Sequence, residues 1–429
     1  MSRHAEQLMQ IGLVATMILR CKSHRKPYWN KRITMPKRVG NIFGEVACDG
    51  NARAAITNAS RGKRERPTVK HALNEIERHS AELVSLVGER RYAPSPSINV
   101  MILDGPHKKV RKIAIPKFWP DQCVHWMVMQ VVQPLIVKGM YEHNCGSIPG
   151  RGSKAALDYV QKALETDPQH CAWCLKLDVE KYYEHINHDL LKQKFRRIIK
   201  DPDVLRLLDL IIDSYEIGVP IGYYTSQWFA NFYLQDIDHR IKERLHVPHY
   251  VRYMDDMLLM GSNKRELLRA KKIIENWFAE IGLKIRTNVE NPSKKNWEIF
   301  RPREVGVEFI GTRFVPEKVS ETAHLYCWHR EMNKQTMLRM TRTFRKIALK
   351  GYLSYEDACA VVSYYGIARS GNNWQFEKKW LRPFVSFERA KEVVSIESRK
   401  PRTIKKKLRS QRRWSVARCD GEYTAGNHV

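Results

Sequence analysis

The apolar positions of this chain follow a helical period in some segments and a strand period in others. Residues 67–90 carry apolar side chains at helical spacing and predict an amphipathic helix. Residues 98–116 predict two strands joined by the polar turn DGPHKK, and a helix follows from about Pro120. Helical and apolar strand patterns then alternate from Ser153 to about Ser320, and residues 321–390 are again helical in pattern. The mixture predicts an α+β fold.

The charge of the chain indicates a polyanionic partner. Its 429 residues include 75 Lys and Arg against 46 Asp and Glu, a formal net charge of +29. An excess of this size favours nucleic acid. An anionic membrane surface would call for a long basic amphipathic helix or a spanning segment, and the sequence shows neither. The apolar run Leu8–Leu19 is too short to span a bilayer and favours a packed helix over a signal peptide.

The cysteines predict a reducing, cytoplasmic environment. There are nine, an odd number, scattered along a chain without a convincing secretory signal. One CxxC pair occurs, Cys171 and Cys174, but no second pair lies at metal-ligand spacing. Because this stretch runs into an apolar strand pattern, buried thiols are favoured over a zinc site.

Acidic side chains interrupt two of the predicted strands. Residues 249–261 read HYVRYMDDMLLMG, with Asp255 and Asp256 between apolar runs. Adjacent carboxylates are costly to desolvate unless cations compensate, although Asp-Asp alone is also typical of an exposed turn. Asp178 ends another apolar strand and is followed by Tyr182 and Tyr183. Strand alternation predicts that one of these two tyrosines lies in the core.

Between the two acidic sites lies IGVPIGYYTSQWFANFYL, residues 217–234. A glycine-rich turn, Gly218–Gly222, leads into a helix for which Thr225 or Ser226 is the expected N-cap. Gly222 allows another group to approach the backbone closely. The order of elements is a basic hairpin, a strand ending in Asp before aromatics, a glycine turn with S-Q-x-x-A-N, and Y-x-D-D. This order resembles the palm of reverse transcriptases over roughly residues 100–320.

The resemblance implies a right-hand polymerase with fingers, an antiparallel palm sheet with helices, and a helical thumb. We expect a basic N-terminal leader at 1–66, fingers and palm at 67–320, the thumb at 321–395 and a basic tail at 396–429. The stretch EFIGTRF resembles a primer-grip hairpin around Gly311. Nine Lys or Arg and no acid lie between Arg399 and Arg413, which favours a nucleic-acid-binding arm over a solubilising tail.

Asp178, Asp255 and Asp256 are the catalytic residues that the resemblance implies. Phosphoryl transfer from a dNTP to a primer needs two divalent ions about 3.5–4 Å apart, and oxygen ligands suit Mg²⁺. Asp178 and Asp255 are the expected principal ligands, with Asp256 and the Val179 carbonyl beside them. The partners implied are an RNA template, a DNA or RNA primer, and dNTPs.

The expected dNTP contacts come from four parts of the chain. An aromatic at Tyr183 would crowd the sugar 2′ position, and Lys109 and Arg111 would grip the triphosphate. Which lysine does so among Lys108, Lys109 and Lys112 stays open, as does the proton donor to pyrophosphate among Lys284, Lys294 and Lys295. The full set of expected contacts is Lys109, Arg111, Val179, Tyr183, Ile221, Gly222 and Gln227.

The residues around Ile221 narrow the resemblance. Retroviral and group II intron enzymes have Gln before the motif glycine, whereas Ile221-Gly222 followed by S-Q and F-A-N resembles diversity-generating retroelements. In that family the apolar residue is linked to adenine-directed misincorporation, and a small basic accessory protein is a further expected partner; a homo-oligomer stays open. The alternatives are an antiphage defence reverse transcriptase, using a noncoding RNA or no template, and an inactive nucleic-acid-binding module. The intact aspartates argue against the last.

Overall fold

A computed structural model describes residues 38–104, 109–286, 297–318, 326–369, 371–399 and 414–415. The chain divides into two units, Met1–Arg38 and Val39–Val429, and every element described below belongs to the second. The run Leu8–Leu19, Lys108 and almost all of the basic tail lie outside the described residues. No helix within the described ranges is long and apolar enough to cross a membrane.

Helices begin earlier than the expected boundary at residue 67. Helix α2 (Phe43–Val46) and helix α3 (Asp49–Ser60) fall within the expected leader, and α3 packs on α6 (Cys123–Lys138). Small and branched side chains of α3 make this close packing possible and are fully or almost fully buried: Ala52, Ala55, Ile56 and Ala59. The folded unit therefore starts at Val39 rather than at residue 67.

The segment 67–90 forms two helices instead of the single one expected. Helix α4 (Pro67–Asn74) and helix α5 (Ile76–Gly88) are separated by Glu75, whose φ of −115° and ψ of 41° are not helical. The predicted hairpin is present, with β1 (Ile98–Asp104) antiparallel to β2 (Lys109–Ile115). A short π-helical turn, Phe118–Gln122, connects it to α6. The sequence pattern thus predicted the hairpin correctly but did not predict the break at Glu75.

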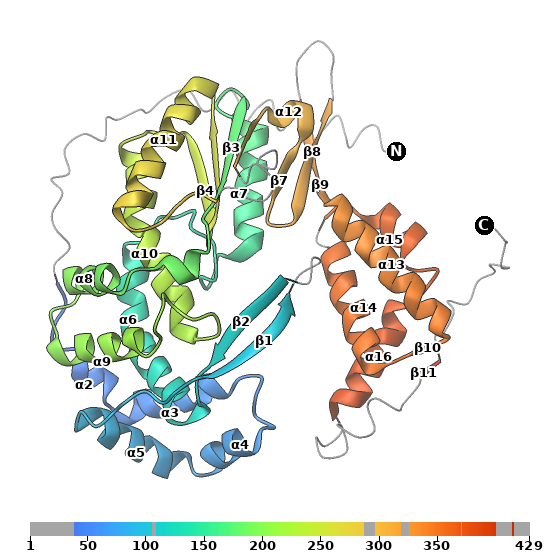
Figure 1. The fold of residues 1–429 in the computed structure, drawn as a ribbon. Coiled ribbons are helices and arrows are strands. Elements are labelled where there is room, and N and C mark those ends of the chain that lie inside the picture. The colour runs from blue at the N-terminus through green and yellow to red at the C-terminus, as the bar shows by residue number, and fades with distance from the viewer. Residues whose placement is uncertain are drawn as a thin grey trace, which may run out of the picture. The chain divides into compact units, whose positions relative to one another are not determined.

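A four-stranded antiparallel sheet forms the centre of the unit, in the order β4-β5-β3-β6. Its strands are β3 (Trp173–Asp178), β4 (His249–Tyr253), β5 (Asp256–Gly261) and β6 (Glu298–Phe300). Both faces of β5 are covered, since Met257, Leu258, Leu259 and Met260 are fully buried. Figure 1 shows α11 (Lys264–Glu280) and α7 (Gly152–Thr166) on opposite sides of this sheet. The helices α8 (His188–Ile198), α9 (Pro202–Asp213) and α10 (Tyr224–Glu243) complete this part.

Cys171 and Cys174 belong to the core that packs on α7. Both are free thiols, and burial raises the pKa of each above its ordinary value. This is the environment expected of core thiols.

A second, three-stranded sheet precedes the C-terminal helices. It runs β7 (Val307–Phe309), β8 (Thr312–Lys318), β9 (Tyr326–Met332), and a short helix α12 (Pro302–Val305) leads into it. Residues 326–332 were expected to belong to a wholly helical thumb, and that was wrong. Trp328 and Met332 are buried while the strand pairs with β8 along its length, so sheet pairing overrides the helical pattern.

Four helices follow: α13 (Lys334–Lys350), α14 (Tyr355–Ala368), α15 (Trp374–Trp380) and α16 (Phe387–Arg399). They share a separate core that includes Phe344, Val361, Tyr365 and Leu381. The short strands β10 (Tyr352–Leu353) and β11 (Trp414–Ser415) pair with one another. The expected helical segment is therefore present, beginning at Lys334.

Candidate active site

Three aspartates meet where β3 and β5 lie side by side. Asp178, the last residue of β3, is the cross-strand partner of Asp256, the first residue of β5. Asp255 lies in the turn between β4 and β5, which is closed by the pair Tyr253 and Asp256. Burial, followed by the charge of the neighbouring Asp255, raises the pKa of Asp256 to about 6. Burial, followed by the charge of Asp178, also raises the pKa of Asp255. The negative charges of neighbouring carboxylates therefore contribute to the raised pKa of Asp255 and of Asp256.

A buried charge network holds this turn in place. Arg252 on β4 and Asp238 on α10 form an ion pair at 2.6 Å, and neither side chain has any exposed surface. The Arg252 guanidinium also donates to the carbonyl of Met254 at 2.9 Å and to Asn231 Oδ1 at 3.2 Å. Met254 has a φ of 57°, uncommon for a residue with a side chain. The peptide directly before Asp255 is thus tied to α10.

Asn231 extends the network to the loop before α7. Its Nδ2 donates to the carbonyl of Gly146 at 2.7 Å. A Cβ at Gly146 would lie 2.5 Å from the backbone nitrogen of Met254, which leaves room only for glycine beside the turn.

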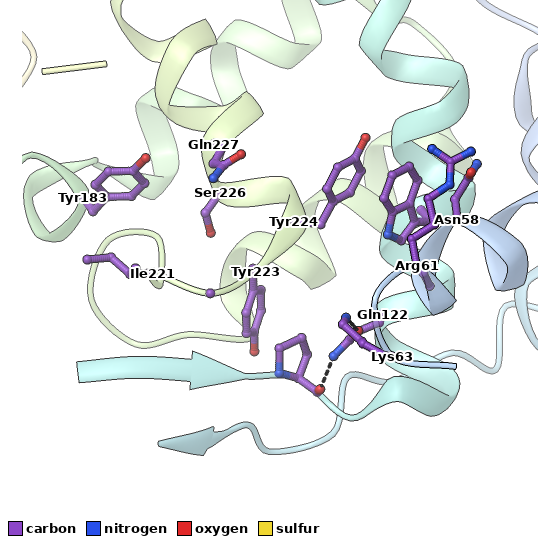
Figure 2. A pocket seen from close by; sticks show the side chains of 14 residues that line it. Asn58, Arg61, Lys63, Gln122, Tyr183, Ile221, Tyr223, Tyr224, Ser226 and Gln227 are labelled. Carbon is purple, nitrogen blue, oxygen red and sulfur yellow. Dashed lines mark hydrogen bonds between the residues drawn. The ribbon is translucent and has the colours of Figure 1, made fainter. Parts of the chain in front are cut away.

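A cavity of about 350 Å³ lies beside the glycine turn. Tyr183, Ile221, Gly222 and Gln227, four of the residues expected to contact a dNTP, line it together. In Figure 2, Tyr183 and Ile221 lie at one end of the cavity and Asn58 and Arg61 at the other. The remaining lining residues come from the end of α3 and the loop after it, the segment around α6, and the start of α10: Asn58, Ala59, Arg61, Lys63, Pro116, Gln122, Trp126, Tyr223, Tyr224 and Ser226.

The adjacent tyrosines separate into core and cavity. They lie in a 3₁₀ turn, Tyr182–His185, rather than on a strand. Tyr182 is 2 % exposed and donates its hydroxyl to the carbonyl of Ala230, whereas Tyr183 lines the cavity. Burial raises the pKa of Tyr183, and the charge of Asp255 raises it further. Tyr183 therefore lies between the cavity and the carboxylates.

The glycine turn joins the hairpin, the tyrosine turn and α10. A Cβ at Gly222, where φ is 118°, would lie 2.3 Å from the carbonyl oxygen of Ala114, and Ala114 N donates to the Ile221 carbonyl at 2.8 Å. The close approach expected at Gly222 is thus made by β2. Val219 N donates to the Tyr183 carbonyl at 2.9 Å, which fixes the tyrosine turn to the same loop.

The expected N-cap of α10 was wrong. The helix begins at Tyr224 with Tyr223 as its N-cap, and no side chain caps it. Thr225 and Ser226 lie in the first turn instead, and both hydroxyls are buried without a hydrogen-bond partner among the described residues. The helix therefore starts two or three residues earlier than expected.

The hairpin places one of its expected triphosphate contacts within electrostatic reach of the carboxylates. Arg111 stands opposite Ile102 in the hairpin. Burial raises the pKa of both Asp255 and Tyr183, and the positive charge of Arg111 partly opposes that rise. For Lys109 the structure describes the backbone alone, paired with Asp104.

Val179 extends β3 by a single bridge to Ile285. The two hydrogen bonds that flank this bridge use the carbonyls of Asp178 and Lys284, and neither uses that of Val179. Of the three candidate proton donors, Lys284 is within the described ranges, while Lys294 and Lys295 are outside them.

The residues around the three aspartates and the cavity match a known protein family. Residues 103–294 match the family model "Reverse transcriptase (RNA-dependent DNA polymerase)". These residues are similar to a reverse transcriptase domain. The matched range contains all three aspartates, Tyr183 and the glycine turn. The helices and antiparallel sheets together make the fold α+β.

Individual relatives match the chain over only part of their length. Protein YkfC of Escherichia coli (strain K12) is 26 % identical over 164 residues, which span 36 % of this chain and 42 % of YkfC. Among solved structures, apo telomerase from Candida tropicalis truncated from its C-terminal domain aligns with a TM-score of 0.41 and 14 % identity, covering 58 % of each chain. Telomerase from Candida albicans in complex with a fragment of telomeric RNA aligns with a TM-score of 0.39 and 11 % identity, covering 63 % of this chain and 55 % of that chain.

The three aspartates are the candidate ligands for divalent metal. In the described ranges, His, Cys, Asp and Glu side chains form no group of three or more that could hold a metal ion by itself. Mg²⁺ seldom needs one, because it keeps several waters and binds through one or two carboxylates together with substrate phosphates. Asp178, Asp255 and Asp256 supply the hard oxygen ligands that Mg²⁺ prefers, and burial together with the neighbouring carboxylates raises the pKa of Asp255 and Asp256. The residues present therefore fit divalent metal ions.

The structure adds functional residues that the sequence did not indicate. Arg252, Asp238 and Asn231 support the catalytic turn, and Arg61 and Lys63 reach the cavity. An arginine inside an apolar strand was the one signal for the first group, because a fully buried arginine requires an acidic partner. No local pattern pointed to the second group.

Proposed function

We propose that this chain synthesises cDNA on a dedicated RNA by two-metal phosphoryl transfer, as the reverse transcriptase of a diversity-generating retroelement. One observation carries the proposal: Tyr183, Ile221, Gly222 and Gln227 line a single cavity, and Tyr183 also interacts with the catalytic turn through Asp255. A nucleotide in this cavity would have its sugar and phosphates directed towards the carboxylates.

Asp178, Asp255 and Asp256 would hold two Mg²⁺ ions, with the Val179 carbonyl as a further ligand. When bound, such ions lower the pKa of the primer 3′-hydroxyl and neutralise the leaving pyrophosphate. The chain's own part is to hold the carboxylates in fixed positions, through Arg252 and the β3–β5 register. Arg111 adds a cation suited to bidentate phosphate contact, and Lys109 is its expected companion.

Tyr183 is the proposed sugar-selecting residue. Its ring lines the cavity, and the Val219 amide holds its backbone, so the side chain has little freedom to retreat. A fixed ring at the sugar 2′ position would exclude a hydroxyl sterically. The substrates are therefore dNTPs and the product is DNA.

Nucleic-acid partners fit the opposite end of the cavity and the thumb. Arg61 and Lys63 supply positive charge there, and the rings of Trp126 and Tyr224 stack with centroids 3.7 Å apart at 10°. Cations beside aromatic surfaces are typical of single-strand binding. Helix α13 carries six cations and no acid, which suits a duplex backbone: Lys334, Arg339, Arg342, Arg345, Lys346 and Lys350. The proposed partners are an RNA template and a primer.

The retroelement assignment depends on Ile221. Its apolar side chain lines the cavity next to Gly222, where a Gln could hydrogen-bond a base. Loss of such a bond is worth on the order of 1 kcal/mol, several-fold in discrimination. A small basic accessory protein and a cytoplasmic location accompany this assignment, the latter from the cysteine usage.

The first test removes the metal ligands. Asp255→Ala/Asp256→Ala should abolish Mg²⁺-dependent dNTP incorporation on a primed RNA template while RNA affinity stays within about twofold. The matched control is Asp213→Ala, an aspartate on α9 whose side chain is half-exposed and pairs with Lys192. Full activity in the double variant would refute the metal assignment.

The second test compares the fidelity of wild type and Ile221→Gln by sequencing cDNA made on a mixed-base RNA. Wild type should misincorporate far more opposite template adenines than opposite other bases, and Ile221→Gln should reduce those errors. Uniformly accurate copying by wild type would exclude diversity generation and favour antiphage defence, with a noncoding RNA or non-templated synthesis.

A further inference from the structure

Arg286 is held against one of the catalytic carboxylates by two hydrogen bonds. Its backbone N donates to the Asp178 carbonyl at 2.8 Å, and its guanidinium Nη1 donates to Asp178 Oδ2 at 2.9 Å. The antiparallel bridge between Val179 and Ile285 sets this pairing, because it places Arg286 opposite Asp178 and Lys284 opposite Glu180. The contact is therefore fixed by strand register and not by a chance approach of two side chains.

The charge of Arg286 also reaches the rest of the cluster. It lowers the pKa of Asp255 and of Asp256, against the larger effects of burial and of the neighbouring carboxylates, which raise both. Among the side-chain ion pairs of the described ranges, Arg286 makes the one to Asp178. Arg286 thus occupies a carboxylate that a metal ion would also need.

We infer that Arg286 is the resident counter-ion of the catalytic cluster, and that a divalent cation must displace its guanidinium from Asp178 to fill the site. The inference rests on the proposed metal site. Its consequence is that Arg286 stabilises the metal-free enzyme and raises the metal concentration at which the site fills.

The exposure of the pair makes this exchange feasible. The Arg286 side chain is 46 % exposed and that of Asp178 is 21 % exposed, so the guanidinium can move into solvent while its backbone stays paired. Arg252 shows the contrast, because it is fully buried and its guanidinium is committed to Asp238. A half-exposed ion pair is weak enough for a competing cation to replace.

The test is Mn²⁺ binding to the full chain without nucleic acid, measured from the EPR signal of free Mn²⁺. Arg286→Met should bind Mn²⁺ about three- to five-fold more tightly than wild type, the gain expected when a half-exposed competing pair is removed. The matched control is Lys284→Met, which removes one exposed positive charge two residues away, opposite Glu180 instead of Asp178. It should change the affinity by less than about twofold, as a distant screened charge does.

A second measurement separates the possible failures. In EDTA, Arg286→Met should have a lower thermal midpoint than wild type, and MgCl₂ should raise its midpoint by more than it raises that of wild type. Equal metal affinity and equal Mg²⁺ shifts in Arg286→Met and Lys284→Met would overturn the arginine inference alone. If Asp255→Ala/Asp256→Ala binds Mn²⁺ as wild type does, the proposed metal site fails, and the inference with it.

Discussion

Replacing Arg252 with Met should destabilise the protein more than almost any other single charge removal in the described chain. Both partners of the Arg252–Asp238 pair have 0 % side-chain exposure, so the substitution leaves a buried carboxylate that still accepts a hydrogen bond from the Tyr250 hydroxyl at 2.7 Å. Breaking a buried pair by removing one partner costs about 3–5 kcal/mol. Folded domains are stable by only about 5–15 kcal/mol, so the loss is a large part of the total.

The assay is urea unfolding followed by tryptophan fluorescence, with two comparison variants. Arg196→Met removes a cation from the more exposed pair with Asp209, where the side chains are 45 % and 27 % exposed, and should cost at most about 1 kcal/mol. Arg252→Met/Asp238→Leu removes both buried charges and should recover much of the loss, because no unpaired charge is left. If Arg252→Met costs no more than Arg196→Met, the buried network does not stabilise the turn as argued.

Three further predictions concern the cavity, acid stability and RNA binding. Tyr183→Ala should admit ribonucleotides in primer extension with NTPs, whereas Tyr182→Ala should mainly lower stability, and the reverse outcome would reassign the sugar-selecting ring. Burial lowers the pKa of His125 to about 3, so the unfolded chain binds a proton more readily below pH 6.5. Stability should therefore fall as pH drops from about 6.5, by about 2 kcal/mol at pH 5, and His125→Phe should remove that part of the slope in urea titrations at pH 7.5 and 5. Deleting residues 399–429, which hold the nine-cation run, should flatten the dependence of RNA affinity on salt, and an unchanged slope would indicate a solubilising tail.

Features that depend on local chemistry could be predicted from the sequence. The hairpin at residues 98–115, the strand ending at Asp178 and the turn at Asp255 each follow from alternation and turn residues within a short window. The division of Tyr182 and Tyr183 into core and cavity was also expected. The geometry behind it was not, because a 3₁₀ turn rather than a strand separates the two rings.

Features that depend on packing between distant segments could not be predicted. Arg61 and Lys63 meet Ile221 in one cavity only because α3 packs on α6, an arrangement that no local pattern encodes. Residues 326–332 have a pattern compatible with a helix and become a strand because β8 offers an edge to pair with. The break at Glu75 and the start of α10 at Tyr224 likewise lack a local signal, since no side chain caps α5 or α10.

Arg252 and Arg286 solve different parts of one electrostatic problem. The site must hold three carboxylates together, yet a cation buried permanently among them would cancel the charge that attracts metal. Arg252 avoids this because its charge is neutralised by Asp238, so it can fix the Met254 carbonyl while adding little net field at Asp255. Arg286 is half-exposed and bonded directly to Asp178, so it compensates the cluster only while it stays there. The buried Arg252–Asp238 pair therefore holds the turn rigidly without adding net charge. The half-exposed Arg286 neutralises part of the charge of the aspartates and can be displaced. The same division explains why Arg252→Met should mainly lower the free energy of unfolding, and why Arg286→Met should mainly change metal affinity.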